Sequence, residues 1–274
     1  MRRISAIFLL VTFLISSSVV FAQKQSADPI KNPKRAYDGW KLVWADEFNG
    51  KKLDTSSWER CPRNGADWGR HMSYLDTLVQ VEDGVLKLYG INRPAEVNDN
   101  VPYLTGGVQS RNRRSLQLGR VDVRARFDCG QGFWPAIWLM PDIRVPWATG
   151  GEIDIMEHLN SEDKAYQTVH SQHTVKKYDP YIVNGSNTPI DKSVFNTYSV
   201  VIEEDAIKFF INGEPTFTYK KVPELLSQFP YAGHPFYVIL SAQLGGSWVG
   251  KINPADLPVK MEIDYVRFYL PKKK

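Results

Sequence analysis

Cysteine is scarce in this sequence of 274 residues, which contains only Cys61 and Cys129. Small secreted domains that depend on disulfides carry many more cysteines at short spacings, so that class is excluded. A chain of this length can bury a core large enough to fold without such bridges. An oxidising compartment would permit one bridge between the two thiols, and the sequence leaves open whether it forms.

An excess of one charge sign is also missing. The chain has 34 Lys and Arg against 30 Asp and Glu, a formal net charge of +4. Proteins that bind nucleic acid usually display a basic stripe, and no segment of this sequence forms one. The run Lys272–Lys274 lies at the end of the chain, and we interpret residues 271–274 as a solvated basic tail. No nucleic-acid partner is expected.

Long apolar runs are absent except near the N-terminus. Arg2 and Arg3 precede the apolar stretch Ile4–Phe21, and Ala22 closes a small-residue cleavage site. This order is typical of a secretory signal peptide over residues 1–22, although a stretch of this length could also serve as a membrane anchor. A polar, flexible leader over residues 23–37 follows directly, which favours cleavage. We therefore expect a secreted or periplasmic protein with no membrane span after signal removal.

Helical periodicity is missing as well. Short runs rich in Val, Ile, Tyr and Phe are separated by turn residues instead. The Asn212–Gly213 pair between Ala206–Ile211 and Pro215–Tyr219 is the strongest hairpin signal among them. Many short strands with turn signals predict an all-β sandwich, and the simplest organisation is one catalytic domain over residues 38–270. Only Pro223–Phe229 is expected to form a short helix.

A run of carboxylates stands out in the segment Gly150–His158. Alternate residues of a strand share a face, so Glu152 and Asp154 should point the same way. Glu157 has the opposite parity, and one extra residue near Ile155, a β-bulge, would return it to that face. Glu152 and Glu157 would then lie about four strand steps apart, roughly 13 Å between backbones, and their side chains could lean together. This spacing allows, without establishing, the carboxyl separation of about 5–5.5 Å that a retaining glycosidase needs.

The chemistry expected of this strand is acid–base and nucleophilic catalysis. Glu152 would attack the anomeric carbon and Glu157 would protonate the leaving oxygen, while Asp154 holds the two in unequal charge states. The alternatives are a solvated acidic face, which should carry interleaved Lys or Arg, and a calcium site, which usually takes loop oxygens from several directions. The segment Glu262–Arg267 also begins Glu-Ile-Asp, but it has no third carboxylate and is interpreted as a structural strand.

The segment Gly151–Glu157 resembles the active-site strand of glycoside hydrolase family 16 in its bulged form. Four further segments look like strands of that family: Trp44–Phe48, Gly119–Arg126, Gly132–Leu139 and Asp264–Tyr269. The resemblance implies a concanavalin-like β-jelly-roll sandwich with a concave substrate cleft, and cleavage of internal β-linkages with retention. It implies no catalytic cofactor and no catalytic metal. Members often carry a structural calcium, for which Asp264 is a candidate ligand.

Carried over by position, the resemblance makes Glu152 the nucleophile, Asp154 the assisting residue and Glu157 the acid/base. It also implies contacts to sugar through aromatic side chains at the cleaved bond, on the cleft floor and at the cleft edge, and through a histidine on the leaving-group side. The substrate-binding candidates are Met72, Trp134, Trp138, Trp147, His170, Gln243 and Trp248. Core packing is the alternative for each tryptophan.

Two departures from the family pattern bear on the substrate. Laminarinases often carry an Asn/Glu-Leu-Gln-Tyr-Tyr-Thr-like stretch on the non-reducing side of the cleft, where this chain has Trp68–Asp76. In Ser241–Gly246 the usual apolar run is replaced by one that contains Gln243. Together with Glu157–Asn160, these features are similar to secreted bacterial endo-β-galactosidases that act on poly-N-acetyllactosamine of mucin O-glycans. That substrate is the lead prediction.

Several alternatives stay open. A laminarinase or another galactanase would use the same carboxylates, and Arg111, Arg113 and Arg114 leave room for a sulfated galactan. A transglycosylase differs only in whether sugar or water resolves the intermediate. The non-enzyme alternative is a carbohydrate-binding lectin, which predicts the loss of a catalytic Glu. In every case the expected partner is an oligosaccharide or polysaccharide, and the chain is expected to be a monomer.

Overall fold

A computed structural model describes residues 37–176, 182–225 and 227–272. The chain divides into Met1–Arg35 and Ala36–Lys274, and all described residues belong to the second part. The expected signal peptide, the leader up to residue 36 and the last two residues of the expected basic tail lie outside the described residues. Among the described residues, no helix has the length and apolar character that a membrane crossing requires.

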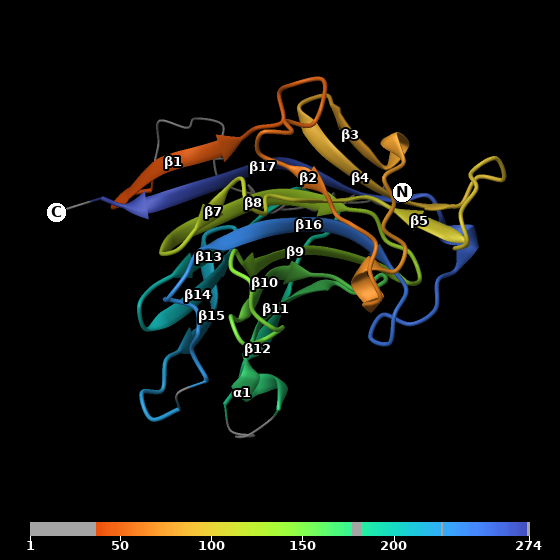
Figure 1. The fold of residues 1–274 in the computed structure, drawn as a ribbon. Coiled ribbons are helices and arrows are strands. Elements are labelled where there is room, and N and C mark those ends of the chain that lie inside the picture. Colours follow the sequence, from red (N-terminus) through yellow and green to blue (C-terminus); the bar gives the residue numbers. More distant parts are fainter. Residues whose placement is uncertain (1–36, 177–181, 226, 273–274) are drawn as a thin grey trace, which may run out of the picture. The chain divides into compact units, whose positions relative to one another are not determined.

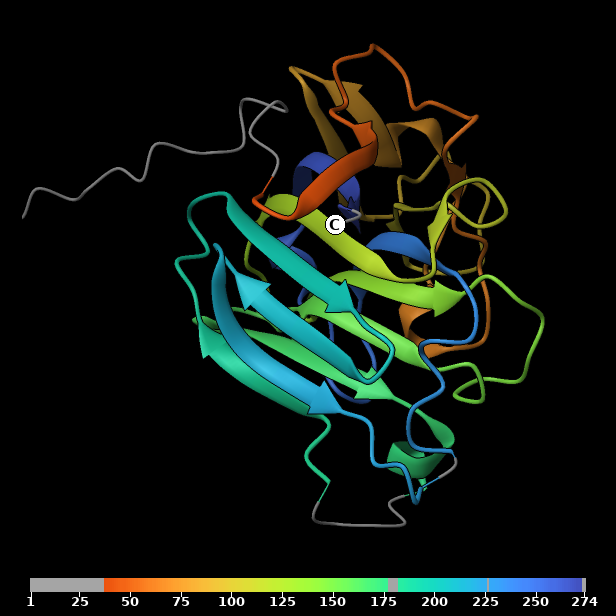
Figure 2. The same ribbon diagram turned by 90° about the vertical axis from the view of Figure 1, so that its left-hand side faces the viewer.

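Two antiparallel sheets make up the described fold, which confirms the predicted all-β jelly-roll sandwich (Figure 1). Sheet A has the order β15-β14-β13-β8-β17-β4-β3, with β1 on β17 and β5 on β4. In Figure 2 its strands β13, β14 and β15, coloured cyan to blue, face the viewer. The bounds of sheet A are β1 (Trp40–Asp46), β3 (Val79–Glu82), β4 (Val85–Asn92), β5 (Tyr103–Thr105), β8 (Gly119–Phe127), β13 (Asn196–Ile202), β14 (Ala206–Ile211), β15 (Glu214–Lys220) and β17 (Val259–Pro271).

Sheet B has the order β12-β11-β10-β9-β16-β6-β2, with β7 on β16. Its bounds are β2 (Glu59–Arg60), β6 (Gly107–Gln109), β7 (Ser115–Leu116), β9 (Phe133–Pro141), β10 (Glu152–Glu157), β11 (Lys164–His170), β12 (Gly185–Pro189) and β16 (Phe236–Leu244). The described helical segments are short: α1 (Gln172–Val175) and the 3-10 turns η1 (Asp67–Gly69), η2 (Asp76–Leu78) and η3 (Pro254–Asp256).

The apolar residues form two clusters. The larger lies between the sheets, where side chains such as Val123 of β8 and Ile153 of β10 are fully buried. The smaller cluster consists of Cys61, Met72, Ala136, Trp138, Tyr237 and Ile239. Since Trp138 and Ile239 have the opposite strand parity to the buried Leu139 and Val238 of the main cluster, the smaller cluster lies on the outer face of sheet B.

Local turn chemistry explains the hairpins. Asn212 and Gly213 both have positive φ, as a tight two-residue hairpin requires, and they join β14 to β15 where the sequence predicts a turn. The predicted helix at Pro223–Phe229 is wrong, because the described residues of that segment form turns. Gln228 explains the difference: its side chain bonds the Lys220 carbonyl and the Val222 N–H, and such local bonds compete with a helix.

The question of a disulfide is answered within the described structure. Cys61 and Cys129 are both free thiols, and Cys61 is buried in the smaller cluster. Burial raises the pKa of the Cys61 thiol far above its usual range, which keeps it protonated.

Candidate active site

The predicted bulge is present in β10. Asp154 pairs with Trp138 of β9, and Met156 pairs with the next residue, Ile137, so β10 has one residue more than its partner. The pairing with β11 shifts between the same positions. The extra residue gives Glu157 the same facing as Glu152 and Asp154, and all three carboxylates line one cleft.

The three carboxylates have little exposed surface. Burial raises the pKa of Glu152 to about 7, helped by Asp154, although His170 and a hydrogen bond from Trp147 oppose the shift. Burial also raises the pKa of Asp154, and burial together with the Asp154 charge raises the pKa of Glu157 well above its usual value. Burial and the closeness of like charges both disfavour full ionisation of this group of carboxylates.

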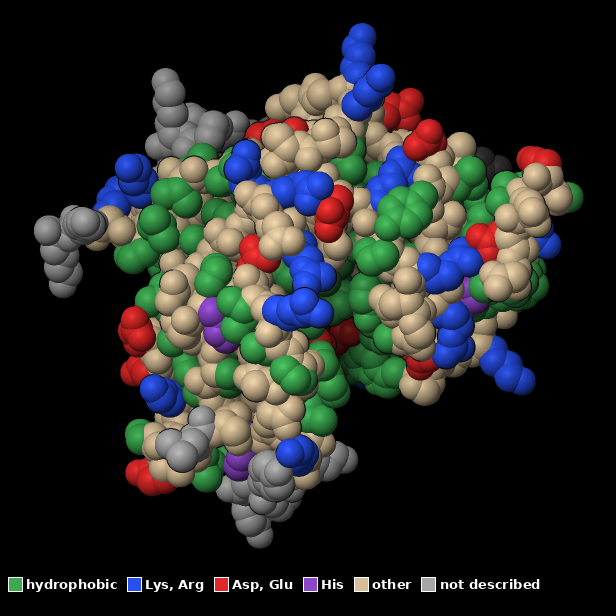
Figure 3. All heavy atoms as spheres, in the orientation of Figure 1, with side chains coloured by type: hydrophobic (Ala, Val, Ile, Leu, Met, Phe, Trp, Pro, Cys, Tyr) green, Lys and Arg blue, Asp and Glu red, His purple; other side chains and the backbone are tan. Residues whose placement is uncertain are grey.

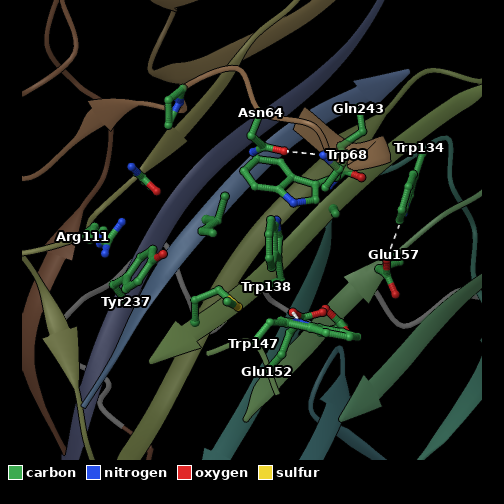
Figure 4. A pocket seen from close by; sticks show the side chains of 17 residues that line it. Asn64, Trp68, Arg111, Trp134, Trp138, Trp147, Glu152, Glu157, Tyr237 and Gln243 are labelled. Carbon is green, nitrogen blue, oxygen red and sulfur yellow. Dashed lines mark hydrogen bonds between the residues drawn. The ribbon is translucent and has the colours of Figure 1, made fainter. Parts of the chain in front are cut away.

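Indole N–H groups orient the two glutamates (Figure 4). Trp147 Nε1 donates to Glu152 Oε2 at 2.7 Å, and Trp134 Nε1 donates to Glu157 Oε1 at 2.9 Å. His170 faces Glu152 across the β10–β11 ladder, and its Nε2 lies 3.2 Å from Asp154 Oδ2 and 4.0 Å from Glu152 Oε1. Each glutamate therefore has its own fixed donor, and the histidine lies between Glu152 and Asp154.

The cleft has a volume of about 580 Å³. Figure 3 shows it as a hollow with acidic atoms inside and basic side chains at its margin. One row of its lining residues crosses four strands of sheet B, from Asp154 through Trp138 and Ile239 to Gln109. The cleft therefore runs across the strands, with the carboxylates on β10 and an arm over β9, β16 and β6.

Four substrate-binding candidates line this cleft or face its carboxylates: Trp134, Trp138 and Trp147 at its wall, and His170 as described above. Trp147 is 55% exposed, so its ring is available to a ligand. Trp138 donates to Ser241 Oγ at 3.1 Å and is 5% exposed. Most of the Trp138 ring is therefore packed against its neighbours, and little of it is open to the cleft.

Gln243 is buried in the cleft wall. Its Nε2 donates to Ser241 Oγ at 2.8 Å, while its Oε1 has no hydrogen-bond partner among the described residues. A buried amide oxygen without a partner is costly. Gln243 is among the residues that line the cleft, so it stays a specificity candidate.

Two candidates lie outside the lining. Trp248 is 47% exposed and contacts Trp134 and Tyr166 edge-on, which places it beside the Glu157 end of the cleft. Met72 must be corrected: it is 1% exposed in the cluster on the outer face of sheet B, where its sulfur accepts a hydrogen bond from Thr105. Met72 packs beside the residues of the cleft floor and is not among the residues that line the cleft.

Sequence reasoning missed several residues of the cleft. Strand parity with Gln243 could have identified Tyr237 and Ile239, because residues 237, 239, 241 and 243 of β16 share a face. Trp68 comes from the loop before β3 and contacts Trp138 edge-on, a long-range contact that no local pattern predicts. The remaining missed lining residues are Pro62, Asn64, Ala66, Gln109, Ala136 and Met140.

The prediction that Glu262–Arg267 is a structural strand, unlike the carboxylate strand at Glu152, agrees with the surroundings of Glu262. Burial alone would raise the pKa of Glu262. Hydrogen bonds from Arg126 and Lys260 outweigh burial and bring this pKa below its usual value. Asp264, the candidate calcium ligand, is paired with Arg124. A metal ion could instead find ligands at Glu152, Asp154 and His170, whose ligand atoms lie within 4.8 Å of one another.

Comparisons with known proteins agree with this geometry. A keratan-sulfate endo-1,4-beta-galactosidase of Sphingobacterium multivorum is 33% identical, and the match covers 96% of this chain and 67% of the relative. A glucan endo-1,3-beta-glucosidase A1 of Niallia circulans is 34% identical over 85% of this chain, which spans only 38% of that relative. A structure described as belonging to endo-acting O-glycanases of the human gut microbiota superposes with a TM-score of 0.75, at 30% identity, covering 85% of this chain and all of the other.

The family model named "Glycosyl hydrolases family 16" matches residues 72–267, a span that contains Glu152, Asp154 and Glu157. This match covers more than half of the chain and agrees with the bulged carboxylate strand and the two antiparallel sheets. The chain therefore belongs to glycosyl hydrolase family 16 and is a glycoside hydrolase.

Proposed function

We propose that this chain is a secreted, retaining endo-β-galactosidase that cleaves internal β-galactosidic bonds of poly-N-acetyllactosamine in mucin O-glycans. The reaction rests on the bulged strand, which directs Glu152, Asp154 and Glu157 into one cleft. The substrate class is supported by the galactosidase of Sphingobacterium multivorum, which matches 96% of this chain. Gln243 contributes a polar side chain to the lining of the cleft.

The mechanism assigns one role to each carboxylate. Ionised Glu152 attacks the anomeric carbon and forms a covalent glycosyl-enzyme, while protonated Glu157 gives its proton to the departing oxygen. Glu157 then takes a proton from water, and the resulting hydroxide displaces Glu152 from the sugar. The Trp147 hydrogen bond and nearby His170 lower the pKa of Glu152 relative to burial alone, which favours ionisation of the nucleophile.

The substrate can be tested by mass spectrometry of the products. The mature enzyme, with Glu152→Gln as blank, is incubated in parallel with porcine gastric mucin and with laminarin. We expect galactose-ended oligosaccharides from mucin alone. Glucose oligomers from laminarin would favour the endo-1,3-β-glucanase alternative, which the relative from Niallia circulans supports. Elongated products would indicate transglycosylation, and intact substrate that stays bound to the protein would indicate a lectin.

The two glutamates can be told apart with azide and an aryl glycoside that has a good leaving group. Such a leaving group needs no proton, so Glu157→Ala should still form the glycosyl-enzyme, which azide then converts to the β-azide. Glu152→Ala lacks the nucleophile, so azide should attack directly and give the α-azide. We expect each variant to lose at least about a thousandfold in kcat on the natural glycan. The same azide from both variants would refute the assigned roles.

A further inference from the structure

The end of the cleft away from Glu157 carries a positive charge. Of the described residues that line the cleft, Arg111 alone is Lys or Arg. Its side chain is exposed, and the guanidinium carbon lies 5.9 Å from the centre of the Tyr237 ring (Figure 4). A cation at this distance from an aromatic ring is weakly attracted to it, by about 0.5–1 kcal/mol at an exposed site, and keeps its charge.

The backbone around Arg111 is fixed on both sides. The Asn112 N–H donates to Asp142 Oδ1 at 3.2 Å, and Asn112 has the positive φ of a tight turn. Ser110 Oγ donates to the Arg114 carbonyl oxygen at 2.6 Å, and Arg113 Nη1 donates to the Arg111 carbonyl oxygen at 3.2 Å. These hydrogen bonds therefore fix the backbone of Arg111 in its loop, and the guanidinium points to the cleft.

The neighbouring carboxylates Glu59 and Asp142 form no ion pair with Arg111 in the described structure. Glu59 accepts from Arg113 at 2.7 Å and from Gln109 at 2.8 Å. Asp142 accepts the Asn112 N–H. Among the described residues, no carboxylate lies within ion-pair distance of Arg111. A guanidinium without an anion at the wall of a ligand cleft can pair with an anionic group of the ligand.

Position separates this charge from the reaction. The backbone of Arg111 lies just beyond β6, and the Tyr237 ring next to its guanidinium belongs to β16, two strands from β10. Two strand spacings amount to about 10 Å, roughly the length of two sugar units. The charge of Arg111 is therefore too far from the carboxylates to take part in bond cleavage.

We propose that Arg111, held over Tyr237, is a subsite for an anionic substituent on a sugar a few units from the cleaved bond. The ligand chemistry is a sulfate ester or a sialic acid carboxylate on the galactan, since the planar guanidinium fork matches either anion with paired hydrogen bonds. This inference rests on the proposed endo-β-galactosidase function and adds to it a preference for acidic over neutral glycans.

The test compares three substrates: keratan sulfate, its chemically desulfated form and sialylated poly-N-acetyllactosamine. The measured quantity is kcat/KM for each acidic substrate divided by kcat/KM for the desulfated one. We expect Arg111→Gln to lower this ratio about tenfold for sulfate, sialic acid or both, mainly through KM, and Arg111→Lys to lower it less. Lys41→Gln removes the same charge from exposed Lys41 on β1 of sheet A and should leave the ratio unchanged.

The outcomes separate the two proposals. A lower ratio only with keratan sulfate identifies a sulfate subsite, and a lower ratio only with the sialylated glycan identifies a carboxylate subsite. Cleavage of all three substrates with a ratio that Arg111→Gln does not change overturns the subsite and leaves the galactosidase proposal intact. If none of the galactans is cleaved by the unmodified enzyme, the proposed substrate fails and the subsite fails with it.

Discussion

At the scale of single residues, identical short sequences acquire opposite properties from their surroundings. Glu152-Ile153-Asp154 and Glu262-Ile263-Asp264 both lie on strands. In the first segment, burial and the neighbouring Asp154 raise the pKa of Glu152, and the indole N–H of Trp147 opposes this shift only in part. The second meets Arg126 and Lys260, so the pKa of Glu262 falls. Position in the sandwich, and not the tripeptide, therefore decides which glutamate can do acid–base chemistry.

This difference predicts how Glu152→Gln changes stability. The folded-state pKa of about 7 lies above the unfolded value, so the protonated form stabilises the fold at low pH and this stability is lost as pH rises through 7. Glutamine cannot ionise, so Glu152→Gln should unfold with a free energy about 1–3 kcal/mol higher than the unmodified protein at pH 8. The gain should shrink at pH 5, and urea unfolding at both values measures it.

Glu262→Gln is the matched control, because its lowered pKa reverses the sign. Its ion pairs stabilise the fold above the unfolded pKa and lose that effect in acid, so Glu262→Gln should be less stable than the unmodified protein at pH 8. A Glu152→Gln protein that is less stable than the unmodified one at pH 8 would contradict the buried, crowded site described here.

At the scale of elements, the entry into β10 depends on a glycine. Gly151 has φ +83°, and a Cβ there would lie 2.5 Å from Tyr231 Cε1, whereas Gly213 has φ +87° and nothing within 4 Å. Tyr231 in turn donates to the His170 carbonyl oxygen at 2.9 Å. A clash at Gly151 therefore displaces a ring that supports the strand opposite Glu152.

Paired alanine substitutions separate strain from this clash. Gly213→Ala should cost about 1–2 kcal/mol of unfolding free energy, the penalty for a side chain at positive φ. Gly151→Ala should cost a further ~1–3 kcal/mol for overpacking and should also lower kcat. Urea unfolding and initial rates measure both effects. Equal stability losses in the two variants, with unchanged kcat, would show that the ring of Tyr231 gives way without moving β10.

Elements with local signals were predictable, and contacts between distant segments were not. The Asn212–Gly213 turn and the bulge beside Ile155 follow from turn chemistry and from strand parity. Met72 was misplaced because its burial depends on packing against Cys61 and Gly107, which no neighbouring residue reveals. Trp68 was missed because its partner, Trp138, lies 70 positions further along the chain.

At the scale of the whole molecule, the N-terminal prediction concerns the chain outside the described residues. When the chain is expressed with its own N-terminus in a secreting bacterium, we expect export and cleavage after Ala22, so that the mature protein begins at Gln23. Intact-mass measurement and N-terminal sequencing of the exported protein check this. Full-length mass in the membrane fraction would indicate the anchor alternative instead.

The cleft that crosses the strands has a consequence for how specificity can diverge. Each of the strands β10, β9, β16 and β6 contributes different residues to the cleft lining. A substitution on β6 or β16 therefore changes one part of the lining without moving the carboxylates on β10. A mutation on β6 or β16 is therefore a small evolutionary step that changes which glycan is bound and leaves the catalytic carboxylates as they are. The same independence suits directed evolution, where libraries confined to β6, β16 and the loop that carries Trp68 should yield enzymes with new glycan ranges and undiminished turnover.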